Sequence, residues 1–162
     1  MRAFLGLGSN VGERLATLRA ARDALDQRPG VRVLRASAAY ETAPQGPILD
    51  QPDFLNACLE VETSLDPEEL LEAAKDVEAE LGREARPTPQ GPRPIDVDLL
   101  TYGAAEYRSD RIELPHPDIT SRRFVLEPLL ELEPELTLPD GTRLTDARDA
   151  LLDQRVARAE PL

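Results

Sequence analysis

The chain has 162 residues and a formal net charge of −12 at pH 7, from 31 acidic and 19 basic side chains. Its length and its 41% hydrophobic content predict one globular domain over residues 1–162, and a single cysteine, Cys58, excludes a disulfide framework and a cysteine zinc site. No apolar run reaches the ~20 residues of a membrane span and no signal peptide is recognisable, so we expect a cytoplasmic protein, whose acidity argues against general nucleic-acid binding.

Apolar periodicity predicts six elements up to residue 102. Leu15, Leu18, Ala21 and Leu25 recur at helical spacing, whereas residues 31–40 alternate apolar and polar side chains as strands do. The elements follow the order strand, helix, strand, strand, helix, strand, over 2–7, 13–27, 31–40, 54–63, 66–82 and 95–102. This is the order of a ferredoxin-like α+β fold, with an antiparallel sheet and helices on one face.

C-terminal helical and hairpin additions and two proline-rich loops complete the chain. The additions are expected to be a strand at 111–114, a helix at 121–132 that Pro128 disturbs, a strand at 136–138 and a helix at 144–157. The loops cover 43–53 and 83–94, and the second contains four prolines and three arginines. A loop of that length inside a compact domain is usually functional or disordered.

Asp96 and Asp98 follow the second loop directly and form the densest chemical signal. Because strand side chains alternate, residues two apart lie on one face, ~7 Å from each other. Two such carboxylates repel unless a cation lies between them, and Mg²⁺ is commonly held by one or two carboxylates together with substrate phosphates. The alternative is a solvated pair on a half-exposed strand, but the adjoining arginine-rich loop favours a metal site.

Arginines near this strand are suited to phosphate. Arg83, Arg86 and Arg93 lie on or beside the loop, and Arg122 follows the only histidine, His116. Arginine makes planar, bidentate contacts with phosphate. His116, between two prolines, either caps backbone groups in a turn or donates a hydrogen bond to phosphate. The chain has no Walker A loop, so arginine and Mg²⁺ would have to hold any nucleotide.

Three weaker signals lie elsewhere. The glycines of GLGSNVG at 6–12 do not have the dinucleotide-binding spacing and predict a tight strand-to-helix turn. Phe54 and Phe124 are core candidates or ligand platforms. Asn56 lies two residues after Phe54 on the same strand face and offers both a donor and an acceptor to a heterocycle edge.

Together these segments resemble the family of 6-hydroxymethyl-7,8-dihydropterin pyrophosphokinases, enzymes of folate biosynthesis. The resemblance covers nearly the whole chain, and the RxxDxDLL block combined with the PH…RxF block is its most specific part. The similar blocks are LGLGSNVG at 5–12, YETAPQGPILDQPDFLNA at 40–57, TSLDPEELL at 63–71, GPRPIDVDLL at 91–100, LPHPDITSRRFVLEPL at 114–129 and PELTLPDG at 134–141.

The resemblance implies transfer of the terminal diphosphate of ATP to the pterin hydroxymethyl oxygen, with release of AMP. It implies that Asp96 and Asp98 bind two Mg²⁺ ions and that the two phenylalanine rings sandwich the pterin, whose edge Asn56 reads. The ATP-binding groups that it implies are Arg83, Arg93, His116 and Arg122, and Arg86 is counted with them as a nearby base. The pterin-binding groups are Thr42, Gln45, Phe54, Asn56 and Phe124. Besides the two substrates, it implies no nucleic acid or membrane partner.

The segment 84–90 departs from the family pattern. Ala85 stands near a position that is usually basic in the family, and Pro89 occupies a second position that is usually basic. Gln90 replaces an aromatic residue before GPR. Arg86 is the candidate substitute for the missing base. The prolines narrow the conformations of this loop, which is expected to close over the nucleotide.

Two other functions fit parts of the pattern. A glycosyl- or nucleotidyltransferase can use a D-x-D pair with a metal and a sugar nucleotide, although the strand order and the Phe/Asn platform fit it poorly. A ligand-binding module without catalysis would tolerate the altered loop. Scattered charge offers no dimer patch, so we expect a monomer.

The charge is distributed unevenly. Residues 41–80 carry a net charge of −11, whereas residues 81–123, which contain most of the expected nucleotide site, are neutral. Two of the acids in the neutral segment are Asp96 and Asp98, and bound Mg²⁺ would cancel them and leave the arginines in excess. We therefore expect nucleotide binding to depend strongly on a divalent metal.

Overall fold

A computed structural model describes residues 1–43, 52–82 and 94–162 of the chain. The elements are β1 (Arg2–Ser9), α1 (Arg14–Asp26), β2 (Val31–Ala36), β3 (Ala38–Thr42), β4 (Phe54–Thr63), α2 (Pro67–Gly82), β5 (Asp96–Tyr102), β6 (Tyr107–Arg108), β7 (Glu113–Leu114), α3 (Arg123–Leu132), α4 (Leu144–Asp149) and β8 (Val156–Pro161). The expected α+β order is confirmed up to residue 102, except that the strand expected at 31–40 is two strands separated at Ser37.

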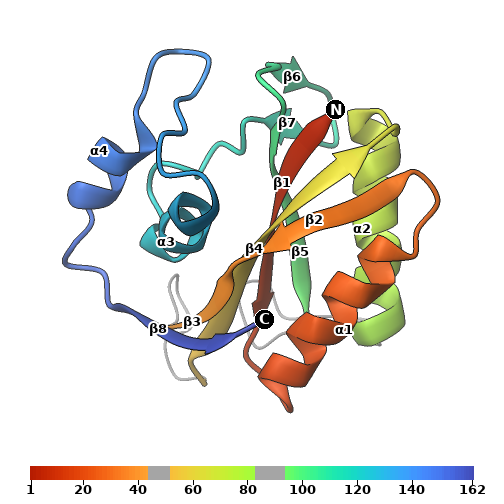
Figure 1. Cartoon of the computed structure of the whole chain (residues 1–162), viewed down its shortest axis with the longest axis horizontal. Helices are drawn as coiled ribbons and strands as arrows, with labels where there is room; N and C mark the ends of the chain where they lie inside the picture. Colours follow the sequence, from red (N-terminus) through yellow and green to blue (C-terminus); the bar gives the residue numbers. More distant parts are fainter. Residues whose placement is uncertain (44–51, 83–93) are drawn as a thin grey trace.

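Six strands form one antiparallel sheet (Figure 1). Their order is β5-β1-β4-β3-β8, and β2 also pairs with β4. The ten-residue strand β4 pairs with β1 along one edge and, along the other, with β3 near its start and β2 near its end. β1 and β4 are therefore central, and β5, which carries the aspartate pair, lies beside β1 at an edge of the sheet.

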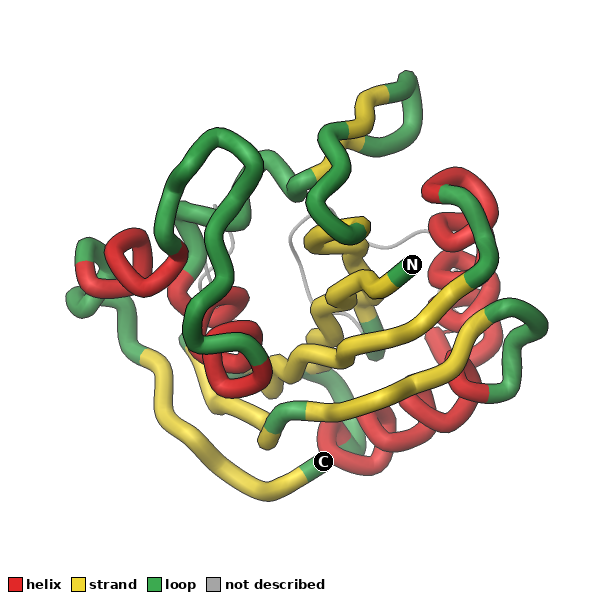
Figure 2. The backbone as a smooth tube through the Cα atoms, turned by 45° about the horizontal axis from the view of Figure 1, so that its top comes forward, coloured by secondary structure: helices red, strands yellow, loops and turns green. Residues whose placement is uncertain are grey.

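The sheet is covered on both faces (Figure 2). Helices α1 and α2 pack on one face, over a core that includes Leu5, Leu59 and Val97, while α3 and α4 pack on the other, over Phe4 and Leu100. The expectation of helices on one face is correct for α1 and α2 only. Because strand side chains alternate, each central strand supplies apolar residues to both cores.

The C-terminal region differs most from expectation. The helix expected at 144–157 is confirmed only over Leu144–Asp149, because α4 ends there and β8, which begins at Val156, pairs with β3. Leu144 is buried and Leu151 packs beside it in the second core, which accounts for the helical spacing. Beyond them, pairing with the edge of β3 overrides the local pattern. In Figure 1 this last strand runs along β3.

The remaining additions are shorter than expected. β7 confirms the strand near 111–114 and pairs with β6 in a small hairpin. The strand expected at 136–138 is reduced to a single bridge between Thr137 and Arg143, across the turn at residues 139–141. Pro128 lies within α3, as expected. None of the helices in the described part of the chain is both long and apolar enough to cross a membrane.

Candidate active site

Three neighbouring strands bring polar side chains to one end of the same sheet face. Gly8 of β1 lies opposite Asp96 of β5 on one side and opposite Asn56 of β4 on the other, and Gly6 lies opposite Asp98. Directly paired residues project from the same face of an antiparallel sheet. The aspartate pair and Asn56 therefore flank a face of β1 on which Gly6 and Gly8 present only backbone. This backbone surface forms the floor between them.

The position of these glycines corrects the expectation of a strand-to-helix turn. Gly6 and Gly8 lie inside β1, and only Gly12, with φ of 70°, lies in the turn before α1. A Cβ on Gly8 would lie 2.8 Å from Oδ1 of Asn56, so the close approach of that amide requires glycine. A Cβ on Gly6 would meet the Leu100 side chain at 3.5 Å, an ordinary contact.

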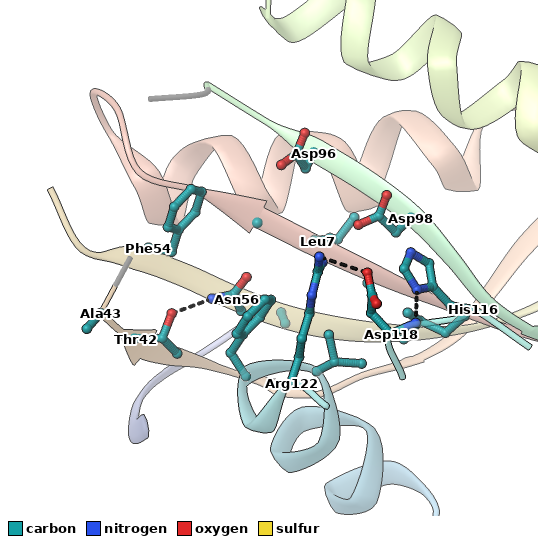
Figure 3. A pocket seen from close by; sticks show the side chains of 16 residues that line it. Leu7, Thr42, Ala43, Phe54, Asn56, Asp96, Asp98, His116, Asp118 and Arg122 are labelled. Atoms are coloured by element: carbon teal, nitrogen blue, oxygen red, sulfur yellow. Dashed lines mark hydrogen bonds and ion pairs between the residues drawn. The ribbon is translucent and has the colours of Figure 1, made fainter. Parts of the chain in front are cut away.

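A pocket of about 440 Å³ stands over this floor (Figure 3). Its lining comes from β1, β3, β4, β5, the turn before α3 and the start of α3. The lining includes the predicted site residues Thr42, Phe54, Asn56, Asp96, Asp98, His116, Arg122 and Phe124. The other predicted site residues lie outside the described residues: Gln45, Arg83, Arg86 and Arg93.

One end of the pocket combines aromatic rings with a fixed amide. Phe54 and Phe124 both line it. The amide Nδ2 of Asn56 donates a hydrogen bond of 2.7 Å to Oγ1 of Thr42, and both residues are buried. This hydrogen bond holds the amide in place, and Oδ1 lies over Gly8 as an acceptor.

The charged end of the pocket meets the aromatic end at Phe124 and carries a cation, an imidazole and a carboxylate. The carboxylate, Asp118, was not among the residues predicted from the sequence. Nη2 of Arg122 lies 2.9 Å from Oδ2 of Asp118, and the guanidinium carbon lies 5.7 Å from the centre of the Phe124 ring. The backbone N–H of Asp118 donates to Nδ1 of His116 at 3.1 Å. The imidazole thus caps a backbone group and also faces the pocket. Asp118 and Arg122 both precede α3, where helical four-residue spacing does not apply, so no local signal indicates this pair.

The aspartate pair meets the chemical requirements of a Mg²⁺ site. Asp96 is half-buried and Asp98 is exposed, and the residues paired with them on β1 are glycines. No group of three or more potential metal ligands occurs within residues 1–43, 52–82 and 94–162. Two carboxylates alone suit Mg²⁺, which completes its octahedral shell with water and substrate phosphates.

Glu78 of α2 supports the same strand from the side of its free edge. Its Oε2 accepts a 2.7 Å hydrogen bond from the backbone N–H of Val97, the residue between the two aspartates. Lys75 donates to its other oxygen at 3.2 Å. Burial raises the pKa of the Glu78 carboxyl, and these two contacts oppose that shift. Glu78 therefore fixes the backbone from which both aspartates project.

Comparison with known proteins identifies related chains. The family model of 7,8-dihydro-6-hydroxymethylpterin-pyrophosphokinase matches residues 4–134. A 2-amino-4-hydroxy-6-hydroxymethyldihydropteridine pyrophosphokinase of Methylorubrum extorquens is 43% identical over 98% of this chain and 99% of the relative. One from Haemophilus influenzae is 35% identical over 98% of each chain.

A solved structure has a similar fold. It is described as HPPK-DHPS in complex with substrates, and it matches 94% of this chain with a TM-score of 0.72 at 14% sequence identity. The present chain spans 43% of that longer protein. At this identity the likeness supports the α+β fold with an antiparallel sheet and helices packed on it.

Proposed function

Since the chain belongs to the 7,8-dihydro-6-hydroxymethylpterin-pyrophosphokinase family, we propose which of its residues perform the reaction of that family. The reaction is pyrophosphorylation of hydroxymethyldihydropterin in folate synthesis, with ATP as the donor. One observation supports the proposal most: all eight predicted site residues in the described part of the chain line a single pocket.

The aromatic end is the proposed pterin site. Phe54 and Phe124 offer their rings to the flat heterocycle, since aromatic groups stack favourably when offset. Oδ1 of Asn56, oriented by the bond from Nδ2 to Thr42, accepts a hydrogen bond from an N–H on the pterin edge. A buried acceptor of this kind discriminates strongly against a ligand without the matching donor, because the acceptor would be left unpaired.

The charged end is the proposed polyphosphate site. Asp96 and Asp98 would hold Mg²⁺, two ions in the proposal, and bound Mg²⁺ supplies charge neutralisation to the phosphates. Arg122 and His116 line the pocket, and we propose that the guanidinium and the imidazole donate hydrogen bonds to phosphate oxygens. Arg83, Arg86 and Arg93 are proposed to supply further positive charge, and Gln45 a contact near the pterin.

Catalysis would then rest on position and electrostatics. The hydroxymethyl oxygen of the pterin attacks the β-phosphorus in line, a new O–P bond forms, the bond between the β-phosphorus and the α–β bridging oxygen breaks, and AMP leaves with that oxygen. The hydroxyl proton passes to solvent. Donors aimed at the moving diphosphate stabilise its charge, so no side chain is needed as a general base.

The chain as a whole is proposed to act as a single domain over residues 1–162, as a monomer in the cytoplasm. The second candidate is a transferase that uses a sugar nucleotide. Only the D-x-D pair of this chain supports it, and the pyrophosphokinase proposal accounts for the same pair. A binding module without catalysis is the third.

One incubation tests the pyrophosphokinase proposal against these alternatives. The protein is mixed with Mg-ATP and 6-hydroxymethyl-7,8-dihydropterin, and nucleotides and pterins are resolved by chromatography. Equal amounts of AMP and pterin diphosphate are expected. ADP in place of AMP would indicate transfer of a single phosphoryl group, and unchanged ATP would contradict the proposal and favour the sugar-nucleotide transferase or the binding module. A parallel incubation of the Asp98→Ala variant controls for contaminating nucleotide hydrolysis.

A further inference from the structure

Asp118 has no role among the residues expected to bind substrate or metal. Yet it lines the pocket, between Arg122 and His116 (Figure 3). A carboxylate is an unfavourable neighbour for polyphosphate, because like charges repel unless a cation separates them. Its place in the pocket is explained by the two contacts that it makes with residues of the site.

The first contact is between its carboxylate and Arg122. Oδ2 lies 2.9 Å from Nη2, and the side chains of Asp118 and Arg122 are 48% and 33% exposed, so the pair is accessible to solvent and to substrate. Arginine has five N–H donors in a planar fork, and the ones not facing Asp118 remain to bind an incoming anion. A free arginine side chain loses rotamer entropy on being fixed, and the ion pair offsets part of that cost before substrate arrives.

The second contact is between its backbone and His116. The N–H of Asp118 donates to Nδ1 at 3.1 Å, and a ring nitrogen that accepts a hydrogen bond carries no proton. In the neutral imidazole the proton is then on Nε2, which acts as a donor. Backbone bonds from Ile119 to His116 and from Ser121 to Asp118, both 3.1 Å, close the turn that holds this geometry.

We propose that Asp118 is a positioning residue for diphosphate transfer. Its carboxylate orients the Arg122 guanidinium in the pocket, and its backbone N–H selects the tautomer of His116 that donates from Nε2. Asp118 itself touches neither the pterin nor the phosphates in this proposal, which rests on the function proposed above. Removing the Asp118 side chain should therefore lower kcat by displacing the Arg122 guanidinium.

A double-mutant cycle tests the side-chain contact. Wild-type formation of AMP is measured first, because its absence would contradict the proposed function and not the role of Asp118. In the active protein, Asp118→Ala should lower kcat about tenfold, since a misplaced electrostatic group loses much of its effect. The KM for ATP should change little, because the loss of a pre-oriented guanidinium and the loss of a negative charge from the pocket act in opposite directions. In an Arg122→Ala background, the same substitution should change kcat less than about twofold.

The cycle separates positioning from general stability. Losses of equal size in both backgrounds, or a wild-type kcat for Asp118→Ala, would overturn the proposal. Asp118→Asn, whose amide oxygen still accepts from Arg122, should stay closer to the wild-type kcat than Asp118→Ala. Glu127→Ala is the matched control: it removes another ion pair with four-residue spacing, Arg123–Glu127 at 2.8 Å, outside the pocket. It should lower thermal stability and leave kcat unchanged.

Nitrogen NMR tests the backbone contact directly. The chain has a single histidine, so ¹⁵N spectra of the imidazole contain one ring. At mildly alkaline pH the free protein should show a bare Nδ1 and a protonated Nε2. A proton on Nδ1 would overturn this half of the proposal whatever the kinetics show.

Discussion

Gly8→Ala is the sharpest single change that the pocket offers. The added Cβ would lie 2.8 Å from Oδ1 of Asn56, closer than a methyl group and an oxygen can approach. The Asn56 amide resists displacement, because its Nδ2 is bound to Thr42 at 2.7 Å and its side chain is buried. The methyl group and the amide therefore compete for one space.

Whether the amide moves or stays, the folded state is destabilised by a free energy of known order. If the amide moves, a hydrogen bond worth about 1 kcal/mol is lost. If it stays, overpacking costs about 1–3 kcal/mol. The same amide is the proposed reader of the pterin edge, so a loss of about 1.4 kcal/mol there would raise the KM for the pterin about tenfold. The KM for ATP, bound at the other end of the pocket, should change less than about threefold.

Steady-state AMP formation and chemical denaturation measure the two effects. Gly6→Ala provides the contrast, because its Cβ would meet Leu100 at 3.5 Å and the backbone there is ordinary strand. Alanine in a strand interior is favoured over glycine by about 0.5–1 kcal/mol, so this variant should be as stable as the wild type or more stable. Equal stability of the two variants, or an unchanged pterin KM for Gly8→Ala, would refute the reasoning.

Three further outcomes are expected. Asp98→Ala should keep its circular dichroism spectrum but lose AMP formation by several orders of magnitude, and excess chelator should abolish ATP binding to the wild type in calorimetry. Glu78→Ala should lower kcat about tenfold by freeing the Val97 N–H, whereas Glu78→Gln, which retains an acceptor, should lower kcat less. Because burial raises the Glu78 pKa, the stability that this carboxyl contributes is lost as the pH rises above its ordinary pKa of 4.5. In urea unfolding, Glu78→Gln should therefore gain stability relative to the wild type as the pH rises through that window. Burial and the hydrogen bond to Glu131 raise the pKa of Tyr40 from 10.0 to about 12. Its contribution to the free energy of unfolding, about 1 kcal/mol after solvent screening, should be complete below pH 10 and lost towards pH 12. Tyr40→Phe should flatten this decline of stability with pH, and an equally steep decline in the variant would exclude Tyr40 as its source.

The parts of the site that could be predicted are those in which local pattern and fold agree. The spacing of Asp96 and Asp98 on a strand places both on one face whatever the strand pairs with, and Asn56 follows Phe54 by the same rule. The helical spacing of the apolar residues in α1 and α2 similarly favours a helix over a strand. These features need no knowledge of distant contacts.

The parts that were missed depend on pairing between distant segments. Gly8 resembles a turn glycine in sequence, and its role appears only when β1 lies between Asn56 and Asp96 in register. β8 was not expected, and the helix expected at 144–157 included its first two residues, because nothing local indicates that β3 has an open edge to pair with. Asp118 is unremarkable until the turn at residues 116–121 brings it between His116 and Arg122.

The fold also explains how so acidic a chain can bind a polyanion. Four acidic residues of α2 are exposed on the helix that packs on the sheet face opposite the pocket: Glu69, Glu72, Asp76 and Glu80. Exposed charges more than about 10 Å apart are largely screened at ordinary ionic strength. Within the pocket, Asp118 is compensated by Arg122 at 2.9 Å, whereas the aspartate pair at 96 and 98 is the share of the charge that Mg²⁺ would neutralise. The net charge of −12 is therefore a poor guide to this site, because the charges that an ATP molecule meets depend on whether the metal is bound.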